Sequence, residues 1–583
     1  MNIQTTGNRN NALLYLGYIA SVTYLVMGLV FARERLFSDS AGYLFQIMNN
    51  ESFAVMHKRF VSVFAQILPV IFTKLSLHPK VVFYSFFFND WLYFFICSLI
   101  LLLIQKNKTA FGLLWITLTV SLTWSFYSPV SELIQGFPLL LIIVINLSKG
   151  LHKFYQYLIN YFLIVIVLYS HPIYNMFVPL CVATLYLSKN RYPNKQEIIL
   201  FSLVLITIIV RYIGFDTYEN SPLENINPGA GKGALYNLTK FRFGTFLSYT
   251  IFKYTGALIL VLLTVLFTFT HKRIFLTFTT FLILWLYIVI IKFGLIFPES
   301  PEPFERFIFP ILMFSCIILS VLIDIRISSL AFILLAIGVI FQVARRIEFG
   351  TILMQRYTMV QWIIESASQQ PYQKFYLNSN NLNPFLMSGW ILTNETPILC
   401  AINDKPIIQL ATTGDIPENK IKELSDDQYF FFPWWVKNYS TINSRYFKMS
   451  KTPFVNLNSY GEQSQLPDSL FRVNISFFTN KYTLKAGKEA YIPVTIYNNN
   501  KQPIASGLGN DQIFISYHYI DSKGNFVWDG LRTPLLTDIK SSLTQYVKIK
   551  APDVKGDCVF EFDIMFEGKK WCDIKDKIIL TVE

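Results

Sequence analysis

The sequence predicts a polytopic α-helical membrane protein whose chain continues into two segments outside the membrane. Hydrophobic residues make up 53% of the 583 residues and charged residues only 15%, against roughly 25% charged residues in an average globular chain. Several apolar runs reach the ~20 residues that are needed to cross a bilayer. After Arg345 these long runs stop, and short apolar runs separated by Asn, Gly, Pro and Asp replace them.

About eleven spans are expected in residues 1–345, the predicted membrane module. They are Asn11–Phe31, Val81–Ile104, Phe111–Tyr127, Leu133–Leu147, Tyr155–Ser170, Tyr174–Ser188, Glu197–Gly214, Ile251–Thr270, Ile274–Phe297, Phe307–Ile323 and Leu330–Val343. The segment Phe60–Leu77 is apolar but short, and it contains Pro69. We expect a juxtamembrane or re-entrant helix there.

The basic residues of the loops predict the orientation of the spans. Five loops with Lys or Arg fall on one side: Lys106/Lys108, Lys149/Lys153, Lys189/Arg191/Lys195, Lys272/Arg273 and Arg326. The positive-inside rule makes that side the cytoplasm. The N-terminus is then cytoplasmic, and the residues after Arg345 are extracytoplasmic. Much of the net charge of +13 is therefore topological, and we expect no nucleic-acid partner.

Two further domains are expected after the spans. Residues 346–470 predict an extracytoplasmic α/β domain. Trp434 and Trp435 could pack at the membrane surface or in the core of this domain, and we expect the core. Residues 471–583 predict an all-β domain, because strand-like runs recur at near-regular spacing with turn signals between them. This spacing is typical of an immunoglobulin-like sandwich. Cys558 and Cys572 lie on successive candidate strands and could form a disulfide, which spacing alone does not establish.

The outer loops carry basic residues that the topological rule does not require. They are Arg33, Arg35, Lys58, Arg59, Arg211, Lys232, Lys240, Arg242 and Arg306. One interpretation is binding to anionic lipid headgroups. The sharper one is a cationic site for phosphate or pyrophosphate, for which the guanidinium group is geometrically suited. Arg33, Arg59, Arg242 and Arg306 are the substrate-binding candidates of this kind.

The first outer loop contains the principal catalytic candidate. Asp39 is an isolated acid between two serines, and Tyr43 follows one helical turn later. A carboxylate there could act as the general base that deprotonates an acceptor hydroxyl, with Tyr43 contacting substrate. The alternative is that Ser38 or Asp39 only caps the helix that follows.

Two other outer-face constellations could take part in chemistry. Glu302, Glu305 and Arg306 lie at the mouth of a predicted span. Glu305 could be catalytic while Glu302 and Arg306 bind substrate, or Glu305 and Arg306 could form an interfacial salt bridge. Glu132 and His171 each stand at the outer end of a helix hairpin. Glu132 is a further catalytic candidate and His171 a substrate-binding one, although a His beside a Pro is more often structural.

The sequence lacks the motifs of nucleotide and metal enzymes. It has no Walker A motif, no GxGxxG and no paired metal-ligand spacing, and the glycine-rich run 229–233 does not follow a strand. An extracytoplasmic enzyme without a nucleotide needs a donor that is already activated and already across the membrane. A polyprenyl-phosphate-linked sugar is the usual donor of this kind.

The order of these features resembles that of the GT-C-fold membrane glycosyltransferases, which use polyprenyl-phosphate sugars. The run FSDSAGYL carries the acid that this family has after its first span, and ERFIFPIL (Glu305–Leu312) is similar to its E-R-Y-x-x-P segment. The resemblance implies a catalytic base at Asp39 and a phosphate contact at Arg306. Ser40 stands where some branches have a second acid, and the D-x-D metal pattern is missing. The resemblance leaves a divalent metal open, but no D-x-D motif supports one, and the sequence indicates no other cofactor.

A second resemblance concerns the C-terminal domain. The runs SYHYIDSKGNFVWDGLRTPL and KAPDVKGDCVFEFDIMFEGKKW are similar to an immunoglobulin-like module found on bacterial polysaccharide-biosynthesis proteins. Together the resemblances imply an enzyme of the bacterial inner membrane that transfers a sugar to a glycan, lipid or protein acceptor. The alternative is a non-catalytic flippase or transporter for a lipid-linked glycan, for which inverted repeats and charges buried at mid-membrane are expected.

Overall fold

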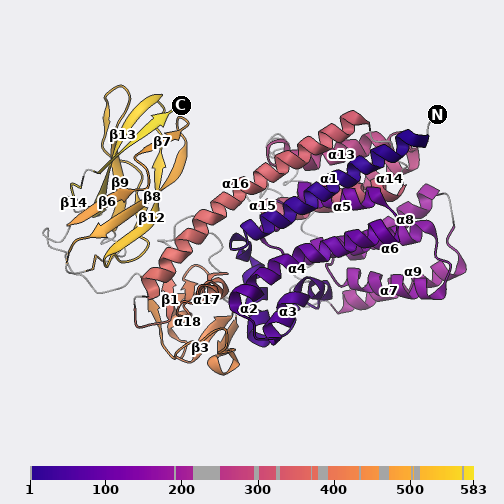
Figure 1. Ribbon diagram of the computed structural model, residues 1–583, viewed down its shortest axis with the longest axis horizontal. Helices are drawn as coiled ribbons and strands as arrows, with labels where there is room; N and C mark the ends of the chain where they lie inside the picture. The colour runs from indigo at the N-terminus through magenta and orange to yellow at the C-terminus, as the bar shows by residue number, and fades with distance from the viewer. Residues whose placement is uncertain are drawn as a thin grey trace. The chain divides into compact units, whose positions relative to one another are not determined.

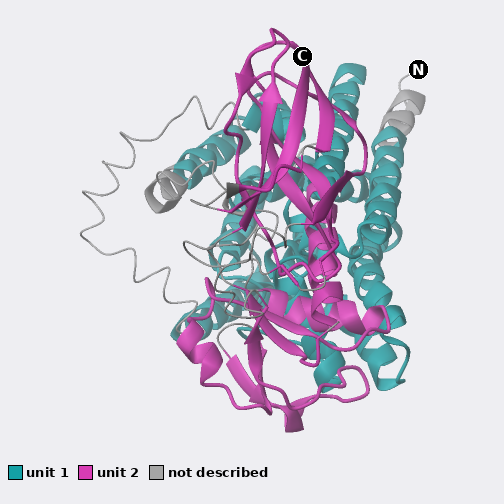
Figure 2. Ribbon diagram, turned by 90° about the vertical axis from the view of Figure 1, so that its left-hand side faces the viewer, with its two compact units in different colours: residues 1–351 teal, residues 352–583 magenta. Residues whose placement is uncertain are grey.

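The computed structural model describes most of the chain. The described residues are 3–189, 192–214, 250–293, 301–322, 328–368, 370–377, 391–431, 435–457, 472–500, 503–504, 513–566, 570–574 and 576–583. They form two compact units, Met1–Thr351 and Ile352–Glu583 (Figure 2). The boundary lies within one long helix, close to residue 345, where the predicted membrane module ends.

The described residues of unit 1 form helices joined by turns and loops, with no strand among them (Figure 1). Its longer helices are α1 (Ile3–Val30), α4 (Pro79–Leu99), α5 (Lys108–Ser121), α6 (Glu132–Lys149), α7 (Phe154–Leu168), α8 (Tyr174–Lys189), α9 (Lys195–Ile213), α13 (Thr255–Thr268), α14 (Lys272–Phe293), α15 (Pro301–Ile317) and the first part of α16 (Ser329–Ser368). The π-helical segments Ile100–Ile104 and Ile318–Leu322 extend α4 and α15.

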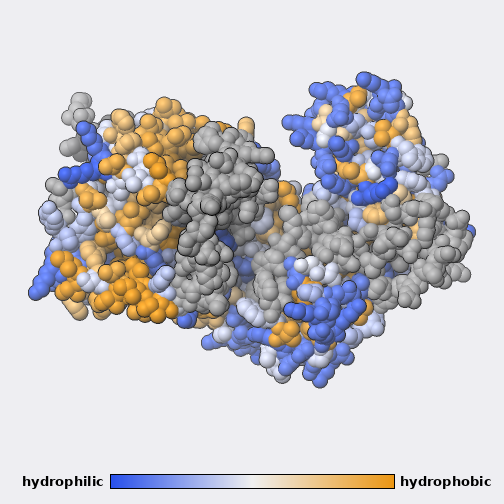
Figure 3. Space-filling view, turned by 180° about the vertical axis from the view of Figure 1, so that it is seen from behind, coloured by the Kyte–Doolittle hydropathy of each residue, from blue (hydrophilic) through white to orange (hydrophobic). Residues whose placement is uncertain are grey.

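Six helices within the described residues are long and apolar enough to cross a membrane: Asn11–Val30, Pro79–Ile104, Glu132–Lys149, Lys195–Ile213, Phe304–Val321 and Ser329–Ser368. On the face that Figure 3 shows, apolar side chains cover much of the described surface of unit 1, whereas the described surface of the C-terminal strands is mostly hydrophilic. A membrane protein with several spans agrees with both observations, and the count of eleven stays a prediction.

The Phe60–Leu77 segment forms two short helices, which agrees with the expected short helix. They are the 3-10 helix Phe60–Gln66 and α3 (Ile67–Lys74), and no helix in this segment is long enough to count among the six. The side-chain amide of Gln66 accepts the N–H of Ala54 and donates to the carbonyl of Ala54, both at 2.8 Å. The side-chain amide of Asn89 likewise bonds the backbone of Leu68 and Phe64. These bonds satisfy backbone groups that a continuous helix would otherwise pair.

Close helix contacts depend on small residues, as is common between membrane helices. A Cβ on Gly17 of α1 would lie 2.6 Å from the Cα of Gly112 on α5, and one on Gly256 of α13 would lie 2.6 Å from the carbonyl oxygen of Gly338 on α16. The backbones of these helix pairs therefore approach too closely for any other residue at Gly17 or Gly256.

Three lysines of the predicted cytoplasmic loops lie at one end of the helices. Lys149 donates to the carbonyl of Gln105, Lys189 donates to the carbonyl of Ser148, and Lys108 contacts Asn11 at 2.9 Å. These contacts join the start of α1 to the start of α5, and the end of α6 to the end of α8 and to the residue that follows the π-helical end of α4. The loops after α1, α5 and α7 therefore lie at the opposite end.

The first part of unit 2 is a small α/β structure. Strands β1 (Lys374–Leu377), β2 (Gln409–Thr412) and β5 (Phe454–Asn456) form a parallel sheet in the order β2-β1-β5, with α17 (Leu392–Ile402) packed on β2 and α18 (Glu418–Lys422) nearby. Strands β3 (Gln428–Phe431) and β4 (Trp435–Asn438) pair separately. Trp434 lies outside the described residues. Trp435 is 48% exposed, so the expected core position is wrong for it.

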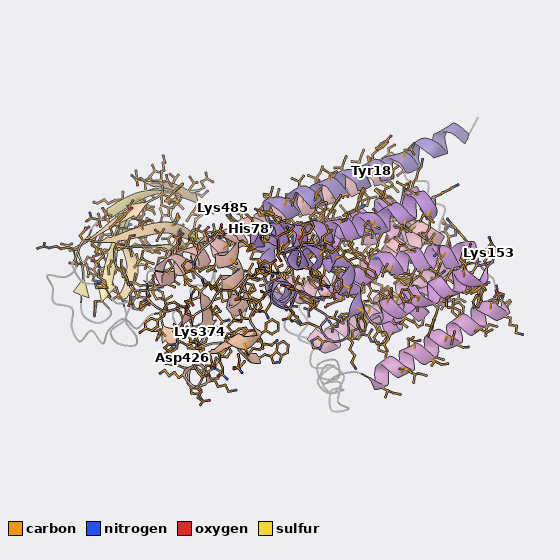
Figure 4. All side chains as sticks on the ribbon, turned by 60° about the horizontal axis from the view of Figure 1, so that its bottom comes forward. Tyr18, His78, Lys153, Lys374, Asp426 and Lys485 are labelled. Atoms are coloured by element: carbon orange, nitrogen blue, oxygen red, sulfur yellow. The ribbon has the colours of Figure 1, made fainter. Side chains whose placement is uncertain are left out.

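Three buried charged residues stabilise this α/β structure. Arg356, from the last part of α16, makes a bidentate ion pair with Glu395 of α17, with both N–O distances 2.6 Å. Lys374 donates to the carbonyls of Gln428 at 2.7 Å and Asp426 at 3.1 Å (Figure 4). Burial lowers the pKa of Lys374 to about 8.

The C-terminal strands form two sheets around one apolar core. One sheet has the order β10-β9-β13-β15-β7, with β11 on β9 and β14 on β13, and the other has the order β12-β8-β6. The strands are β6 (Val473–Phe477), β7 (Lys481–Leu484), β8 (Glu489–Asn498), β9 (Ile513–Ile520), β10 (Phe526–Val527), β11 (Thr533–Pro534), β12 (Ser542–Lys550), β13 (Gly556–Phe566), β14 (Lys570–Trp571) and β15 (Asp576–Val582).

Cys558 and Cys572 are free thiols, as are the other four cysteines. The N–H of Cys572 donates to the carbonyl of Ile564 on β13 at 2.9 Å. Cys558 lies on the same strand at the other end, so the two thiols are separated by roughly 20 Å of extended strand. Disulfide geometry requires Cα atoms within about 7 Å of each other, which excludes the disulfide considered from the sequence.

Candidate functional site

Three segments that are distant in the sequence meet at the end of unit 1 that carries the loop after α1. Tyr43, on the short helix α2 (Asp39–Asn50), donates its hydroxyl to Oε1 of Glu132 at the start of α6. Nη1 of Arg59 lies 3.4 Å from Oε2 of the same carboxylate. The carboxylate is therefore held by a phenol on one oxygen and a guanidinium on the other. We call Tyr43, Arg59 and Glu132 the Glu132 cluster.

The Glu132 cluster is buried. Tyr43 is 3% exposed and Glu132 is 7% exposed. Burial and the neighbouring Glu132 carboxylate raise the pKa of Tyr43 well above its ordinary value. Tyr43 therefore stays protonated and acts as a hydrogen-bond donor. In this setting a charge-assisted hydrogen bond is stronger than it would be in water.

Asp39 lies beside this cluster. It is the first residue of α2, one helical turn before Tyr43, and it is half-buried. The charge of Asp39 is among the causes that raise the pKa of Tyr43. The capping alternative is only partly met, because Ser38 occupies the N-cap position and makes no side-chain capping bond.

Left-handed backbone precedes both Asp39 and Arg59. Ser38 has a φ of 60°, and His57 and Lys58 have φ values of 51° and 57°. Residues other than glycine adopt such angles at a cost of about 1–3 kcal/mol each, and they concentrate at functional sites. Here the strained residues set the directions in which Asp39 and Arg59 leave the chain.

His171 lies close to the start of α6. Its Nδ1 accepts the N–H of Ile173 at 3.3 Å, which is the structural role expected for a His beside a Pro. The turn that contains it packs on α6: Tyr174 donates to the carbonyl of Leu133, and a Cβ on Gly136 would lie 2.5 Å from Ser170 Oγ. The turn that contains His171 therefore packs against the first turns of α6, which begins at Glu132.

Glu305 is placed differently from its predicted role. It is 1% exposed, and its carboxylate accepts the backbone N–H groups of Thr123 at 2.7 Å, Trp124 at 2.6 Å and Ser125 at 2.7 Å. The hydroxyl of Tyr254 donates to it at 2.8 Å. These four donors, rather than a salt bridge with Arg306, engage both oxygens, and they favour a structural role over catalysis.

Two buried arginines bind the carbonyl groups of the same loop region. Arg346 of α16 donates to the carbonyls of Leu118 and Thr119 at 2.8 Å and to that of Leu122. Arg35 donates to the carbonyl of Phe126 at 3.0 Å and pairs with Asp90 of α4 at 2.7 Å. We call Arg35, Arg346 and Glu305 the loop-holding charges, because together they bind both donors and acceptors of residues 118–126.

The remaining predicted basic and acidic residues lie outside the Glu132 cluster. Arg33 is exposed in the turn after α1, and Arg306 is exposed in the first turns of α15. Glu302 lies one turn before Arg306, and its side chain is outside what the structure describes. Arg242 lies outside the described residues altogether. Arg35, expected near a phosphate, is instead fully buried with Asp90.

Asp90 and Arg346 are the functional or structural charges that the sequence analysis did not single out. Asp90 lies inside a predicted span and Arg346 at the end of another. An ionisable residue inside a span is costly and is by itself a signal. That signal could have identified Asp90 but not its partner, because Arg35 is 55 residues away and Lys80 and Lys106 are nearer in the sequence.

Neither a metal-binding arrangement among the described residues nor a similar known protein accompanies this site. Within the described parts of the chain, no group of three or more His, Cys, Asp or Glu side chains is arranged to hold a metal ion. Comparisons with protein-family models, with curated proteins and with solved structures found no match to this chain.

Proposed function

We propose that this chain is an integral-membrane glycosyltransferase that moves a sugar from a polyprenyl-phosphate donor to an extracytoplasmic glycan, lipid or protein acceptor. The observation that carries the proposal is the Glu132 cluster. Asp39, Tyr43, Arg59 and Glu132 are all site residues expected from the sequence, and Tyr43 and Glu132, which bond each other, are 89 residues apart. Their convergence supplies a carboxylate beside a guanidinium, as transfer from a phosphate ester requires.

Each residue has a distinct part in the proposed reaction. The acceptor hydroxyl loses its proton to Asp39 while its oxygen bonds to C1 of the sugar. The bond between C1 and the phosphate oxygen breaks, and the polyprenyl phosphate leaves with both electrons. Arg59, Arg33 and Arg306 bind the phosphate. Glu132 and Tyr43 position Arg59 and do not themselves react.

The proposal also includes four features of the fold and its location. They are about eleven spans in a GT-C-like module, C-terminal domains outside the cytoplasm, a bacterial inner membrane and an immunoglobulin-like C-terminal sandwich. Support comes from the six described apolar helices, from lysines gathered at the end opposite the Glu132 cluster, and from two antiparallel-rich sheets that share one core.

The alternative, a flippase or transporter for a lipid-linked glycan, is favoured by one observation. Asp90 and Arg346 are ionisable and buried in helices that are candidates to span the membrane, as in many transporters. Their partners weigh against this alternative. Asp90 pairs with Arg35 and accepts the hydroxyl of Tyr24 at 2.9 Å, while Arg346 binds backbone carbonyls. Such contacts are those of structural charges.

Replacement of Asp39 by Asn tests the proposal. The amide keeps the shape of the side chain but removes the basic oxygen, and a positioned base contributes about 10²–10⁴-fold to such a step. We expect Asp39→Asn to fold, to bind a short-chain polyprenyl-phosphate hexose, and to transfer the labelled hexose at least about a hundredfold more slowly.

Glu51→Gln is the matched control, because Glu51 stands at the other end of the same helix, at the C-cap of α2. It should transfer at the wild-type rate. Wild-type turnover by Asp39→Asn would contradict the assignment of the base. Movement of the lipid-linked sugar across vesicles without any transferred product would favour the flippase.

A further inference from the structure

Four rings gather on one face of the sheet that contains β9. His518 lies on β9, Phe526 on β10, Trp528 just after β10, and Trp571 on β14. The imidazole of His518 is stacked on Trp528 with 4.2 Å between ring centroids, and it lies 4.2 Å from the ring of Trp571. Phe526 adjoins Trp528 at 5.7 Å. We call these residues the Trp528 platform.

Trp528 is held in place from one side. The Nδ1 of His518 bonds the carbonyl oxygen of Trp528, and because a carbonyl only accepts, Nδ1 carries the proton. The stacked imidazole, tilted by 24°, covers one face of the indole. His518, which is 7% exposed, therefore contacts both the indole ring and the backbone carbonyl of Trp528.

The outer part of the platform is open to solvent. Trp528 is 58% exposed and Phe526 is 50% exposed. Neither belongs to the apolar core between the two sheets, which is built from the opposite face of β9 through residues such as Ile515 and Tyr517. Adjacent exposed aromatic rings cost hydration free energy without stabilising that core, and such patches commonly mark binding sites.

The charges of the hairpin that carries Phe526 and Trp528 are balanced. Asp529 and Arg532 form an exposed pair at 3.5 Å beside Trp528, and the preceding turn carries Asp521 and Lys523. Two acids and two bases leave no net charge on this hairpin. An anionic membrane surface would favour an excess of Lys and Arg, so the balance favours a neutral ligand that forms hydrogen bonds.

We propose that the Trp528 platform binds a neutral oligosaccharide. One apolar face of a pyranose ring carries C–H groups with partial positive charge, which suit the negative face of an aromatic ring. That face would stack on the exposed side of Trp528 with Phe526 beside it, while the hydroxyl groups bond Asp529 and Arg532. The rigid ring loses little conformational entropy on binding. This site is separate from the proposed transfer site and does not depend on transfer activity.

Binding of defined oligosaccharides to the full-length protein tests the proposal. Cellohexaose, maltohexaose, mannohexaose and chitohexaose would be added to the protein in lipid nanodiscs, and saturation-transfer difference NMR would measure their binding. We expect at least one hexamer to bind, and Trp528→Ala to weaken its binding by at least about tenfold. Trp435→Ala is the matched control, because Trp435 is 48% exposed elsewhere in unit 2.

Three outcomes would overturn the proposal. None of the four hexamers binds the wild-type protein, or Trp528→Ala leaves the affinity unchanged, or Trp435→Ala weakens it equally. A second measurement examines the membrane alternative, since tryptophan also favours bilayer interfaces. Quenching of fluorescence by brominated lipid in the nanodisc that disappears in Trp528→Ala would assign the platform to the bilayer surface. Failure of the Asp39 test would leave the hexamer result untouched.

Discussion

Glu132 and Glu305 stand at the beginning of two helices, α6 and α15, and both are buried acids at the same end of unit 1. Their partners differ in kind. Glu132 is held by the side chains of Tyr43 and Arg59, whereas Glu305 is held by three backbone N–H groups and the hydroxyl of Tyr254. Burial alone therefore does not distinguish a carboxylate that binds side chains from one that binds backbone.

The two carboxylates bind different groups. Glu305 accepts backbone N–H groups that have no partner within a helix, and buried backbone groups must be paired. Its contacts shape residues 122–127, which lead directly into α6. Glu132 instead orients a cation, Arg59, that is 12% exposed at its side chain. Glu305 thus stabilises the fold that presents the Glu132 cluster.

The largest expected effect is on stability, from Glu305→Ala. The substitution leaves three backbone N–H groups and one phenol without their acceptor, and each buried unsatisfied group costs about 1–3 kcal/mol. With partial relaxation we expect a loss of about 3–5 kcal/mol in the free energy of unfolding, measured by titration in mixed micelles of a mild detergent and dodecyl sulfate.

Glu305→Gln separates charge from hydrogen bonding in this position. It keeps one accepting oxygen, so its loss of stability should be about half that of Glu305→Ala. Wild-type stability of Glu305→Ala would show that the contacts at residues 123–125 contribute nothing, and Glu305 would return as a catalytic candidate.

The second prediction concerns Arg306, the neighbour of Glu305. Its side chain is exposed, so Arg306→Ala should leave the free energy of unfolding close to that of the wild type. If Arg306 binds the donor phosphate, the lost charge-assisted bond costs about 1.5–3 kcal/mol, a decrease of at least about tenfold in affinity. Equilibrium binding of a fluorescent polyprenyl phosphate measures it.

Substitutions of these two adjacent residues would then affect two different properties of the protein. Glu305→Ala would lose stability, and Arg306→Ala would lose donor affinity. Unchanged donor affinity in Arg306→Ala would remove that residue from the phosphate site and leave Arg59 and Arg33 as the candidates.

Much of the membrane part was predictable because it follows from local composition. Apolar runs and loop charges indicate helices and their alternation without any knowledge of contacts, and the short Phe60–Leu77 segment was recognisable from its length and Pro69. The helix Leu392–Ile402 and the exposure of Trp435 were not, since both depend on packing within unit 2.

The sequence indicated residues of the candidate site, but it did not indicate the hydrogen bonds between them. Isolated charges beside spans identified Asp39, Arg59 and Glu132, yet the sequence could not show that Tyr43 bonds Glu132, 89 residues away. It also could not show that Glu305 accepts N–H groups some 180 residues away. Acids that bind backbone and acids that orient side chains look alike in a sequence, because the difference arises only from tertiary contacts.

The smallest expected effect, and the most direct measure of the Glu132 cluster, is the coupling between Tyr43 and Glu132. Tyr43→Phe removes only the donated hydrogen bond, and Glu132→Gln removes only the charge that strengthens it. Residues in direct contact show interaction energies of about 0.5–3 kcal/mol in a double-mutant cycle. We expect about 1 kcal/mol here, from the unfolding free energies of wild type, both single variants and the double variant.

The donor kinetics of the same four proteins distinguish positioning from general stabilisation. If Tyr43 and Glu132 hold Arg59 toward a phosphate, Tyr43→Phe should raise KM for the donor about threefold to tenfold while kcat changes little, because ground-state and transition-state binding weaken together. Glu132→Gln should raise KM at least as much, since it also weakens the contact with Arg59. A coupling energy near 1 kcal/mol with unchanged KM would mean that the cluster only stabilises the loop after α1, and Asp39 would then act without a positioned cation.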